Sequence, residues 1–258
     1  MTMPLHALLR ALAGAAVLLI AAFVLGRWSP ALGAVPVVLG LALVWLLVPQ
    51  VLPGATFARG RGDGDAMALT FDDGPNGDHT RAVLDVLRRE GVRATFFLVG
   101  EAAAREPDLV RAIAADGHAI GNHTMNHRIL SFLSRPALER ELDAAQRAIT
   151  GAGVPRPTLF RAPHGFRRPF LGGALARLGL TPCAWSHGVW DTDRPGSAVI
   201  AARARRAVRP GSVLLLHDGG AGADRSQTAA ALPAIIAAAR ARRLRLVTLP
   251  ELIAEAHA

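Results

Sequence analysis

Two adjacent carboxylates, Asp72 and Asp73, stand at the end of an apolar run of the chain. The run 67–71 predicts a strand, and the pair Gly74-Pro75 that follows predicts a turn. A strand end that enters a turn can direct both carboxylates into one pocket, where two ionised groups repel each other. We therefore expect a positive group between them. The alternative interpretation is an Asp-rich turn that caps the next helix.

Two imidazoles follow about fifty residues later, at His123 and His127. On a helical turn this spacing places both rings on one face, close enough to bind one metal ion. Two imidazoles with one carboxylate form a three-ligand shell that leaves a position open for water, which is typical of catalytic rather than structural zinc. The spacing alone is a weak signal, and the two blocks that come later strengthen it.

The later blocks are Arg161-Ala162-Pro163-His164-Gly165 and Leu215-Leu216-His217-Asp218. In this order and with these separations, the four blocks resemble those of the polysaccharide deacetylase family, the NodB-homology domain of carbohydrate esterase family 4. The resemblance covers the chain from about Ala66 to its end. It implies a hydrolase that removes an N-acyl group, with N-acetyl expected, from an amino sugar of a polysaccharide or cell-envelope glycan.

The resemblance also implies a cofactor. Asp73, His123 and His127 would hold one divalent metal ion, which acidifies water and polarises the acetamide carbonyl. Zinc is expected from the ligand types, while Co²⁺ or Ni²⁺ can substitute. His79, His118 and His187 are left outside the shell, because it is complete without them.

Further roles follow from the same resemblance. Asp72 would be the general base, with Arg161 close enough to orient it, and His217 would be the general acid that protonates the leaving amine. Leu215 matches an apolar position that lines the acetyl pocket. The family commonly has Tyr where this chain has His164, and the backbone N–H at this position would still serve the oxyanion.

The fourth block of the family, an Asp-Trp pair, is not matched. The segment Trp190-Asp191-Thr192-Asp193 stands nearby. Asp191 is the first candidate for the carboxylate that orients His217 or Arg161, and Asp193 is the second. Trp190 is a candidate wall of the pocket, with core packing as the alternative.

The first 54 residues differ in composition from the rest. They contain no Asp or Glu and only two Arg, whereas the remaining 27 Arg and all 20 acidic residues follow, a net charge of +7. We expect a membrane anchor over 1–54 with two transmembrane helices at about 5–26 and 31–53, joined by a short turn. A cleaved signal peptide and buried core helices are the alternatives. The anchor places the protein at the cytoplasmic (inner) membrane as a multi-pass protein, with the side of the catalytic domain left open.

After a linker at 55–65, residues 66–258 alternate between strand and helix patterns, which predicts an α/β domain with a parallel sheet. Site residues at the ends of strands favour barrel-like closure, and the family implies a distorted, incomplete (β/α) barrel. Strands are expected at 67–71, 94–99, 118–121, 158–160, 180–185, 212–216 and 244–249. Helices are expected at 80–90, 107–116, 136–149, 170–178, 197–208 and 228–240.

Three alternatives to a glycan deacetylase remain. The anchor would keep the pocket near the bilayer, so the substrate can instead be an amino sugar on a lipid carrier, which the enzyme would deacylate or deformylate. A catalytically inactive sugar-binding module is a different class. A phosphoryl-transfer metalloenzyme has only weak support, from the glycines at 219–222. The surplus Arg is spread among acidic residues, and no basic run with interleaved aromatics predicts nucleic-acid binding.

Overall fold

The computed structural model describes residues 17–18, 20–27, 29, 31, 33–40, 56–165, 170–220 and 222–258. The chain divides into two compact units, one of which holds residues 55–165 and 170–258 while the other holds residues 1–54. The predicted division into anchor, linker and catalytic domain stays a prediction.

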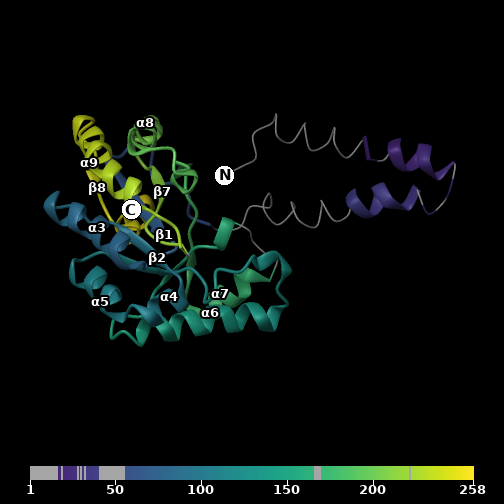
Figure 1. Ribbon diagram of the computed structural model, residues 1–258, viewed down its shortest axis with the longest axis horizontal. Helices are drawn as coiled ribbons and strands as arrows, with labels where there is room; N and C mark the ends of the chain where they lie inside the picture. Colours follow the sequence, from purple (N-terminus) through teal and green to yellow (C-terminus); the bar gives the residue numbers. More distant parts are fainter. Residues whose placement is uncertain are drawn as a thin grey trace. The chain divides into compact units, whose positions relative to one another are not determined.

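The larger unit is built on one sheet of parallel strands (Figure 1). Strands β5, β4, β3, β2, β1, β7 and β6 follow one another across it, and β8 pairs with β1 beside this path. Every ladder is parallel, and among the described residues no ladder joins β5 to β6, so the sheet is a curled half-barrel. In chain order the strands are Ala66–Asp72, Thr95–Leu98, Ala119–Asn122, Leu159–Phe160, Thr181–Pro182, His187–Gly188, Val213–His217 and Arg245–Leu246.

Helices cover the outer face of the sheet (Figure 1). Neighbouring helices pack in pairs, α7 with α6, α6 with α4, α4 with α5, α5 with α3, α3 with α9 and α9 with α8, so their order follows that of the strands. Their bounds are α3 Gly77–Arg89, α4 Gly100–Arg105, α5 Pro107–Ala115, α6 Arg135–Thr150, α7 Leu171–Leu178, α8 Ser197–Ala207, α9 Ser226–Ala241 and α10 Leu249–His257.

Strand β1 lies at the centre and is buried along its whole length. Its alternate side chains enter two cores: Met67, Leu69 and Phe71 belong to the core under α3, α5, α8 and α9, whereas Ala66 and Ala68 belong to a second core that includes side chains of β2, β7 and α10. A strand that is buried on both faces needs a nearly continuous apolar sequence, which is what the chain provides until Asp72. The first ionisable side chain therefore appears where the strand ends.

The register of the ladders brings the ends of distant strands to one level. Asp72 is paired with Phe97 of β2 on one side and with His217 of β7 on the other. Strand β3 ends one residue before His123, and β4 ends one residue before Arg161. The residues that follow β1, β3, β4 and β7 consequently meet at the carboxyl edge of the sheet.

The predicted alternation of strands and helices is confirmed over most of this unit, and two expectations are wrong. The strand expected at 180–185 is reduced to two residues of β5. The strand expected at 244–249 ends at Leu246, because Thr248 and Glu251 form a capping box that begins helix α10. Ser134 stands at the N-cap of α6 without a side-chain capping hydrogen bond.

The predicted transmembrane spans lie largely outside the described residues. In the described part, residues 20–26 and 33–40 are helical, and Gly33 approaches Gly26 so closely that a Cβ there would lie 2.7 Å from the Gly26 Cα. None of the helices in the described part combines the length and apolar character needed to cross a bilayer. The transmembrane hairpin stays a prediction.

Gly121 tests how tightly the half-barrel is packed. A Cβ at this position of β3 would lie 2.4 Å from Phe97 Cδ1, so Gly121→Ala must displace the Phe97 ring. We expect a loss of about 1–3 kcal/mol in the free energy of unfolding, measured by urea denaturation. The matched control is Gly172→Ala in α7, where nothing lies within 4 Å. Equal stability of the two variants would contradict this packing.

Candidate active site

Three predicted metal ligands lie together at the carboxyl edge of the sheet. One ligand atom from each of Asp73, His123 and His127 falls within 4.8 Å of the others. Asp73 Oδ1 lies 3.0 Å from His127 Nε2 and 3.4 Å from His123 Nε2. Atoms that share one tetrahedral ion at about 2.0–2.2 Å are separated by distances of this kind.

The histidine segment is a loop, so the helical turn expected from its spacing is wrong. Residue Asn122 ends β3, and Thr124 and His127 both have left-handed backbone angles, with φ of 67° and 52°. The centroids of the two rings nevertheless lie 5.0 Å apart. The left-handed residues Thr124 and His127 reverse the direction of the backbone and so bring the His127 ring close to that of His123.

The residues present fit a divalent cation. His123 Nδ1 lies 2.8 Å from the carbonyl oxygen of Arg161, so Nδ1–H donates to that oxygen and the lone pair of Nε2 faces Asp73. Asp73 Oδ1 is buried and accepts no well-aligned hydrogen bond in the described part of the chain, although two ring nitrogens are near it. A buried carboxylate oxygen that faces two imidazole nitrogens is the donor set that binds zinc and related ions.

Asp72 is directed to a different partner from its neighbour. Its Oδ1 accepts a hydrogen bond of 2.7 Å from Arg161 Nη1, and its Oδ2 lies 3.8 Å from His123 Nε2. Asp73 has a left-handed φ of 71°, which turns its side chain away from that of Asp72. The two adjacent carboxylates are thus separated, one on the guanidinium and one on the imidazoles, as their mutual repulsion requires.

Arg161 is completely buried, which is costly for a charge unless it is paired and hydrogen-bonded. Nη1 also donates to Thr70 Oγ1 at 2.8 Å, and Nη2 donates to the carbonyl of Ala184 at 2.8 Å. The guanidinium lies 4.1 Å above the ring centroid of Phe97. These contacts fix the plane of the guanidinium and, through it, the orientation of the Asp72 carboxylate.

His217 lies beside a buried carboxylate, that of Asp191. Asp191 Oδ1 lies 2.8 Å from His217 Nδ1, and Asp191 Oδ2 accepts the backbone N–H of His217 at 2.8 Å. Thr228 Oγ1 donates to the same Oδ2 at 2.9 Å. Asp191 is therefore the carboxylate beside His217, whereas Asp193 is exposed.

The pKa values of this pair shift in the directions that suit an acid. Burial alone would lower the pKa of His217, but the hydrogen bond and the charge of Asp191 raise it above its usual value. Burial would raise the pKa of Asp191, and the hydrogen bond from His217 lowers it instead. His217 consequently keeps its proton to a higher pH than a free imidazole does.

The remaining predicted residues lie around this centre. The ring of His164 lies edge-on to that of His127, with centroids 4.7 Å apart, and its own φ of 56° is left-handed. Leu215 is buried on β7. Trp190 is 67% exposed, which rules out the core-packing alternative. Arg203 Nη1 donates to the carbonyl oxygens of Val189 and Trp190 and so holds this segment.

Sequence reasoning missed several residues that support the site. No motif assigns a role to Thr70 or Thr228. In the structure Thr70 accepts a hydrogen bond from Arg161, and Thr228 donates one to Asp191. Asp218 follows His217 in its block and lies under the turn after β1, where Thr80 Oγ1 donates to its Oδ2 at 2.6 Å. Burial raises the pKa of Asp218 to about 7. A Cβ at Gly74 would lie 2.3 Å from Asp218 Oδ2, which explains the glycine of that turn.

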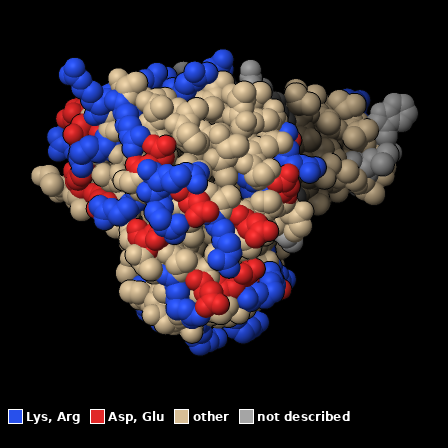
Figure 2. All heavy atoms as spheres, turned by 60° about the vertical axis from the view of Figure 1, so that its left-hand side comes forward, with Lys and Arg blue, Asp and Glu red and all other residues tan. Residues whose placement is uncertain are grey.

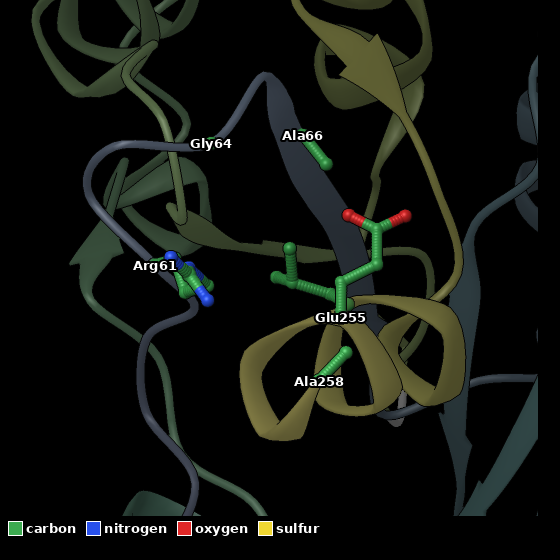
Figure 3. A pocket seen from close by; sticks show the side chains of 6 residues that line it. Arg61, Gly64, Ala66, Glu255 and Ala258 are labelled. Carbon is green, nitrogen blue, oxygen red and sulfur yellow. The ribbon is translucent and has the colours of Figure 1, made fainter.

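Other surface features lie apart from these residues. A hollow of about 210 Å³ opens between the start of β1 and α10, and none of its lining residues is a predicted site residue (Figure 3). Figure 2 shows Arg side chains interspersed with Asp and Glu over one face. This mixed surface agrees with the interpretation of the Arg content as a dispersed charge.

The fold and the site together define a class. At one edge of a parallel half-barrel lie a carboxylate on a buried guanidinium, a candidate metal triad and an imidazole on a carboxylate. These are the kinds of group that metal-assisted hydrolysis requires. The comparisons with known proteins identify the family.

The family description "Polysaccharide deacetylase" matches residues 59–183. A chitooligosaccharide deacetylase of Sinorhizobium fredii is 42% identical over 193 residues, which are 71% of this chain and 89% of that protein. A peptidoglycan-N-acetylglucosamine deacetylase of Bacillus cereus is 37% identical over 196 residues, which are 74% of this chain and 89% of that protein. The family 4 carbohydrate esterase from Streptomyces lividans, solved in complex with acetate, matches with a TM-score of 0.66 and 34% identity over 71% of this chain and 92% of that one.

The chain therefore belongs to the polysaccharide deacetylase family, carbohydrate esterase family 4, with the NodB-type fold. It is an enzyme, a hydrolase of carbon–nitrogen bonds other than peptide bonds.

The Asp191–His217 pair predicts a change in pH dependence. In Asp191→Asn the raised pKa of His217 falls, because its anionic partner is lost. Under the prediction that His217 is the general acid, it works only while it holds its proton, so the alkaline decline of kcat/KM should begin at lower pH, and kcat/KM should drop at least about tenfold at its optimum. Initial rates measured from pH 5 to 10 test this. An alkaline limb at the wild-type position would contradict the role of Asp191.

Proposed function

We propose that this enzyme removes the N-acetyl group from N-acetylglucosamine units of a cell-envelope or chitin-like glycan. The observation that carries the proposal is the convergence of three groups at one strand edge: Asp72 on Arg161, the triad of Asp73 with two histidines, and His217 on Asp191. The two relatives named above act, by their names, on chitooligosaccharide and on peptidoglycan N-acetylglucosamine.

Asp73, His123 and His127 would hold one divalent ion, with Zn²⁺ expected and Co²⁺ or Ni²⁺ able to replace it. Such an ion supplies Lewis acidity toward the acetamide oxygen and lowers the pKa of water. The chain's contribution is the fixed position of the three ligand atoms. His123 is oriented by its Nδ1–H bond to the Arg161 carbonyl, which keeps Nε2 free as a ligand.

Asp72 would take the proton from the attacking water. Arg161 Nη1 donates to Oδ1 at 2.7 Å, which restrains the carboxylate with its Oδ2 on the side of the candidate metal ligands, 3.8 Å from His123 Nε2. A base that is already oriented loses little entropy when water and amide meet. The water then attacks the amide carbon, and the proton resides on Asp72.

His217 would give its proton to the amine nitrogen as the carbon–nitrogen bond breaks. In the β1–β7 ladder His217 is paired with Asp72. The proposed base and acid thus lie on neighbouring strands and would approach the substrate from there. The raised pKa that Asp191 confers keeps the proton available near neutral pH. The products are a free amino sugar and acetate.

The surrounding residues would position the substrate. The backbone N–H of His164 would donate to the oxyanion, and buried Leu215 would contact the acetyl methyl group. The exposed indole of Trp190 would lie against a sugar ring, as flat aromatic faces do in carbohydrate sites. These assignments explain why an exposed Trp adjoins the buried Asp191.

The sharpest test replaces the base. In Asp72→Asn the amide cannot accept the proton, so amine release from N-acetylglucosamine oligomers should fall at least about 100-fold while Co²⁺ or Zn²⁺ still binds. The matched control is Asp78→Asn in the first turn of α3, an exposed carboxylate that should leave the rate unchanged. Undiminished amine release from Asp72→Asn would refute the assignment. A wild-type chain that binds glycan oligomers without releasing amine would instead support an inactive sugar-binding module.

We also propose that residues 1–54 anchor the enzyme in the cytoplasmic membrane. The absence of acidic residues there supports this, as do the exposed apolar side chains of the described part, which include Val17, Ile20, Phe23 and Val38. An anchored pocket would also suit an amino sugar on a lipid carrier, which is the second candidate substrate.

The anchor predicts that the full chain sediments with membranes and resists extraction by high salt and alkaline carbonate, because apolar contact is insensitive to ionic strength. Immunoblots of fractionated cells measure this, and protease treatment of spheroplasts reports the side of the catalytic unit. Recovery in the carbonate-soluble fraction would contradict the anchor.

A further inference from the structure

The loop that carries His123 and His127 is held from two sides by helices. Its carbonyl oxygens at Thr124 and Met125 accept the backbone N–H groups of Gly100 and Glu101, at the start of α4, both at 2.9 Å. On the other side, side chains of β3 and α6 accept hydrogen bonds from backbone N–H groups of the loop. A loop with two left-handed residues is thus fixed by hydrogen bonds to its neighbours.

The N–H partners come from two side chains. Asn122 Oδ1 accepts from Thr124 N at 2.8 Å, while Asn122 Nδ2 donates to the Leu142 carbonyl of α6 at 3.0 Å. Glu141 Oε2 accepts both Met125 N, at 3.1 Å, and Asn126 N, at 3.0 Å.

Glu141 is unusual among the acidic residues of this chain. It is buried on α6, and its Oε1 also accepts the side-chain amide of Asn126, at 3.1 Å. All three of these bonds go to the loop between the two histidines, and no ion pair of Glu141 is found in the described ranges. A buried carboxyl group without a cationic partner is costly unless its oxygens accept several hydrogen bonds.

We propose that Glu141 is a positioning residue of the metal site, which sets the separation of the His123 and His127 ligand atoms by fixing the backbone between them. The inference rests on the proposed function, since it assumes that the triad binds a divalent ion. Metal ligands depend on the groups that orient them, and loss of such a group typically lowers metal affinity by about 10–100-fold. Here the orienting group acts on the backbone of the loop rather than on a ligand ring.

A purely structural role would give a different result. If Glu141 served only to pack α6 against the sheet, its loss would lower stability and leave the affinity of the folded protein for metal unchanged. Metal affinity and the visible spectrum of bound Co²⁺ therefore separate the two roles, because both depend on the ligand geometry and neither requires turnover.

The experiment titrates the metal-free full chain with Co²⁺ and follows the visible absorption, with thermal unfolding of each metal-free variant recorded in parallel. Glu141→Ala should raise the Kd for Co²⁺ at least about tenfold. Glu141→Gln should stay within about threefold of wild type, since the amide oxygen can accept both backbone N–H groups and the Asn126 amide can turn to match the new donor.

Two further variants complete the design. Glu139→Ala is the matched control, because this carboxylate lies two residues away on α6 and, in the part of the chain that the structure describes, accepts its hydrogen bonds from Arg135 and Arg177, at 3.0 and 2.8 Å. It should leave the Kd unchanged. Asn126→Ala removes one bond to Glu141 at an exposed position, and should raise the Kd about two- to fivefold.

The outcomes are distinct. Wild-type affinity in a folded Glu141→Ala would overturn the inference and leave the proposed function standing. If that variant does not fold, Asn126→Ala decides, and an unchanged Kd overturns the inference. A wild-type chain that binds no stoichiometric Co²⁺ or Zn²⁺ would overturn the proposed function together with the inference.

Discussion

The buried guanidinium of Arg161 connects the parts of this site. Its side chain holds Asp72 through Nη1, and its backbone carbonyl accepts the Nδ1–H of His123, so a single residue after β4 orients both the proposed base and a candidate metal ligand. Removal of one partner from such a buried pair costs about 3–5 kcal/mol, because the remaining charge is left without compensation. The geometry of the base and that of the metal triad are therefore coupled through one side chain and its peptide group.

Backbone strain is concentrated around the same centre. Left-handed angles occur at Asp73, Thr124, His127, His164 and Trp190, none of which is glycine. Each costs on the order of 1–2 kcal/mol. The surrounding hydrogen bonds hold these conformations, and the result separates Asp73 from Asp72 and returns the His127 ring to His123. The favourable free energy of packing in the half-barrel offsets the cost of these strained backbone conformations.

Much of this arrangement could be predicted from the sequence. The apolar run before Asp72 and the four motif blocks indicated the parallel sheet and the residues that meet at its edge, because strand ends in such sheets lie at one edge. The catalytic roles of these residues stay a prediction. The loop form of 123–127 could not be predicted, since four-residue spacing fits a helix equally well. Glu141 and Thr228 could not be found either, because their roles depend on which helix packs beside which strand. The spacing of Thr248 and Glu251 is typical of a capping box and could have predicted the start of α10, but the apolar pattern of 244–249 favoured a strand there.

The position of β1 has a consequence for biosynthesis. This strand is among the first of the catalytic unit to leave the ribosome, yet two of its partners, β7 and β8, follow much later in the sequence, and Thr70 donates a hydrogen bond to a carbonyl 144 residues later. Pairings of such long sequence separation form slowly. The centre of the sheet and the position of the proposed acid His217 are thus completed only after β7 and β8 have been translated, so until then the nascent chain carries an unpaired core strand that is prone to aggregation.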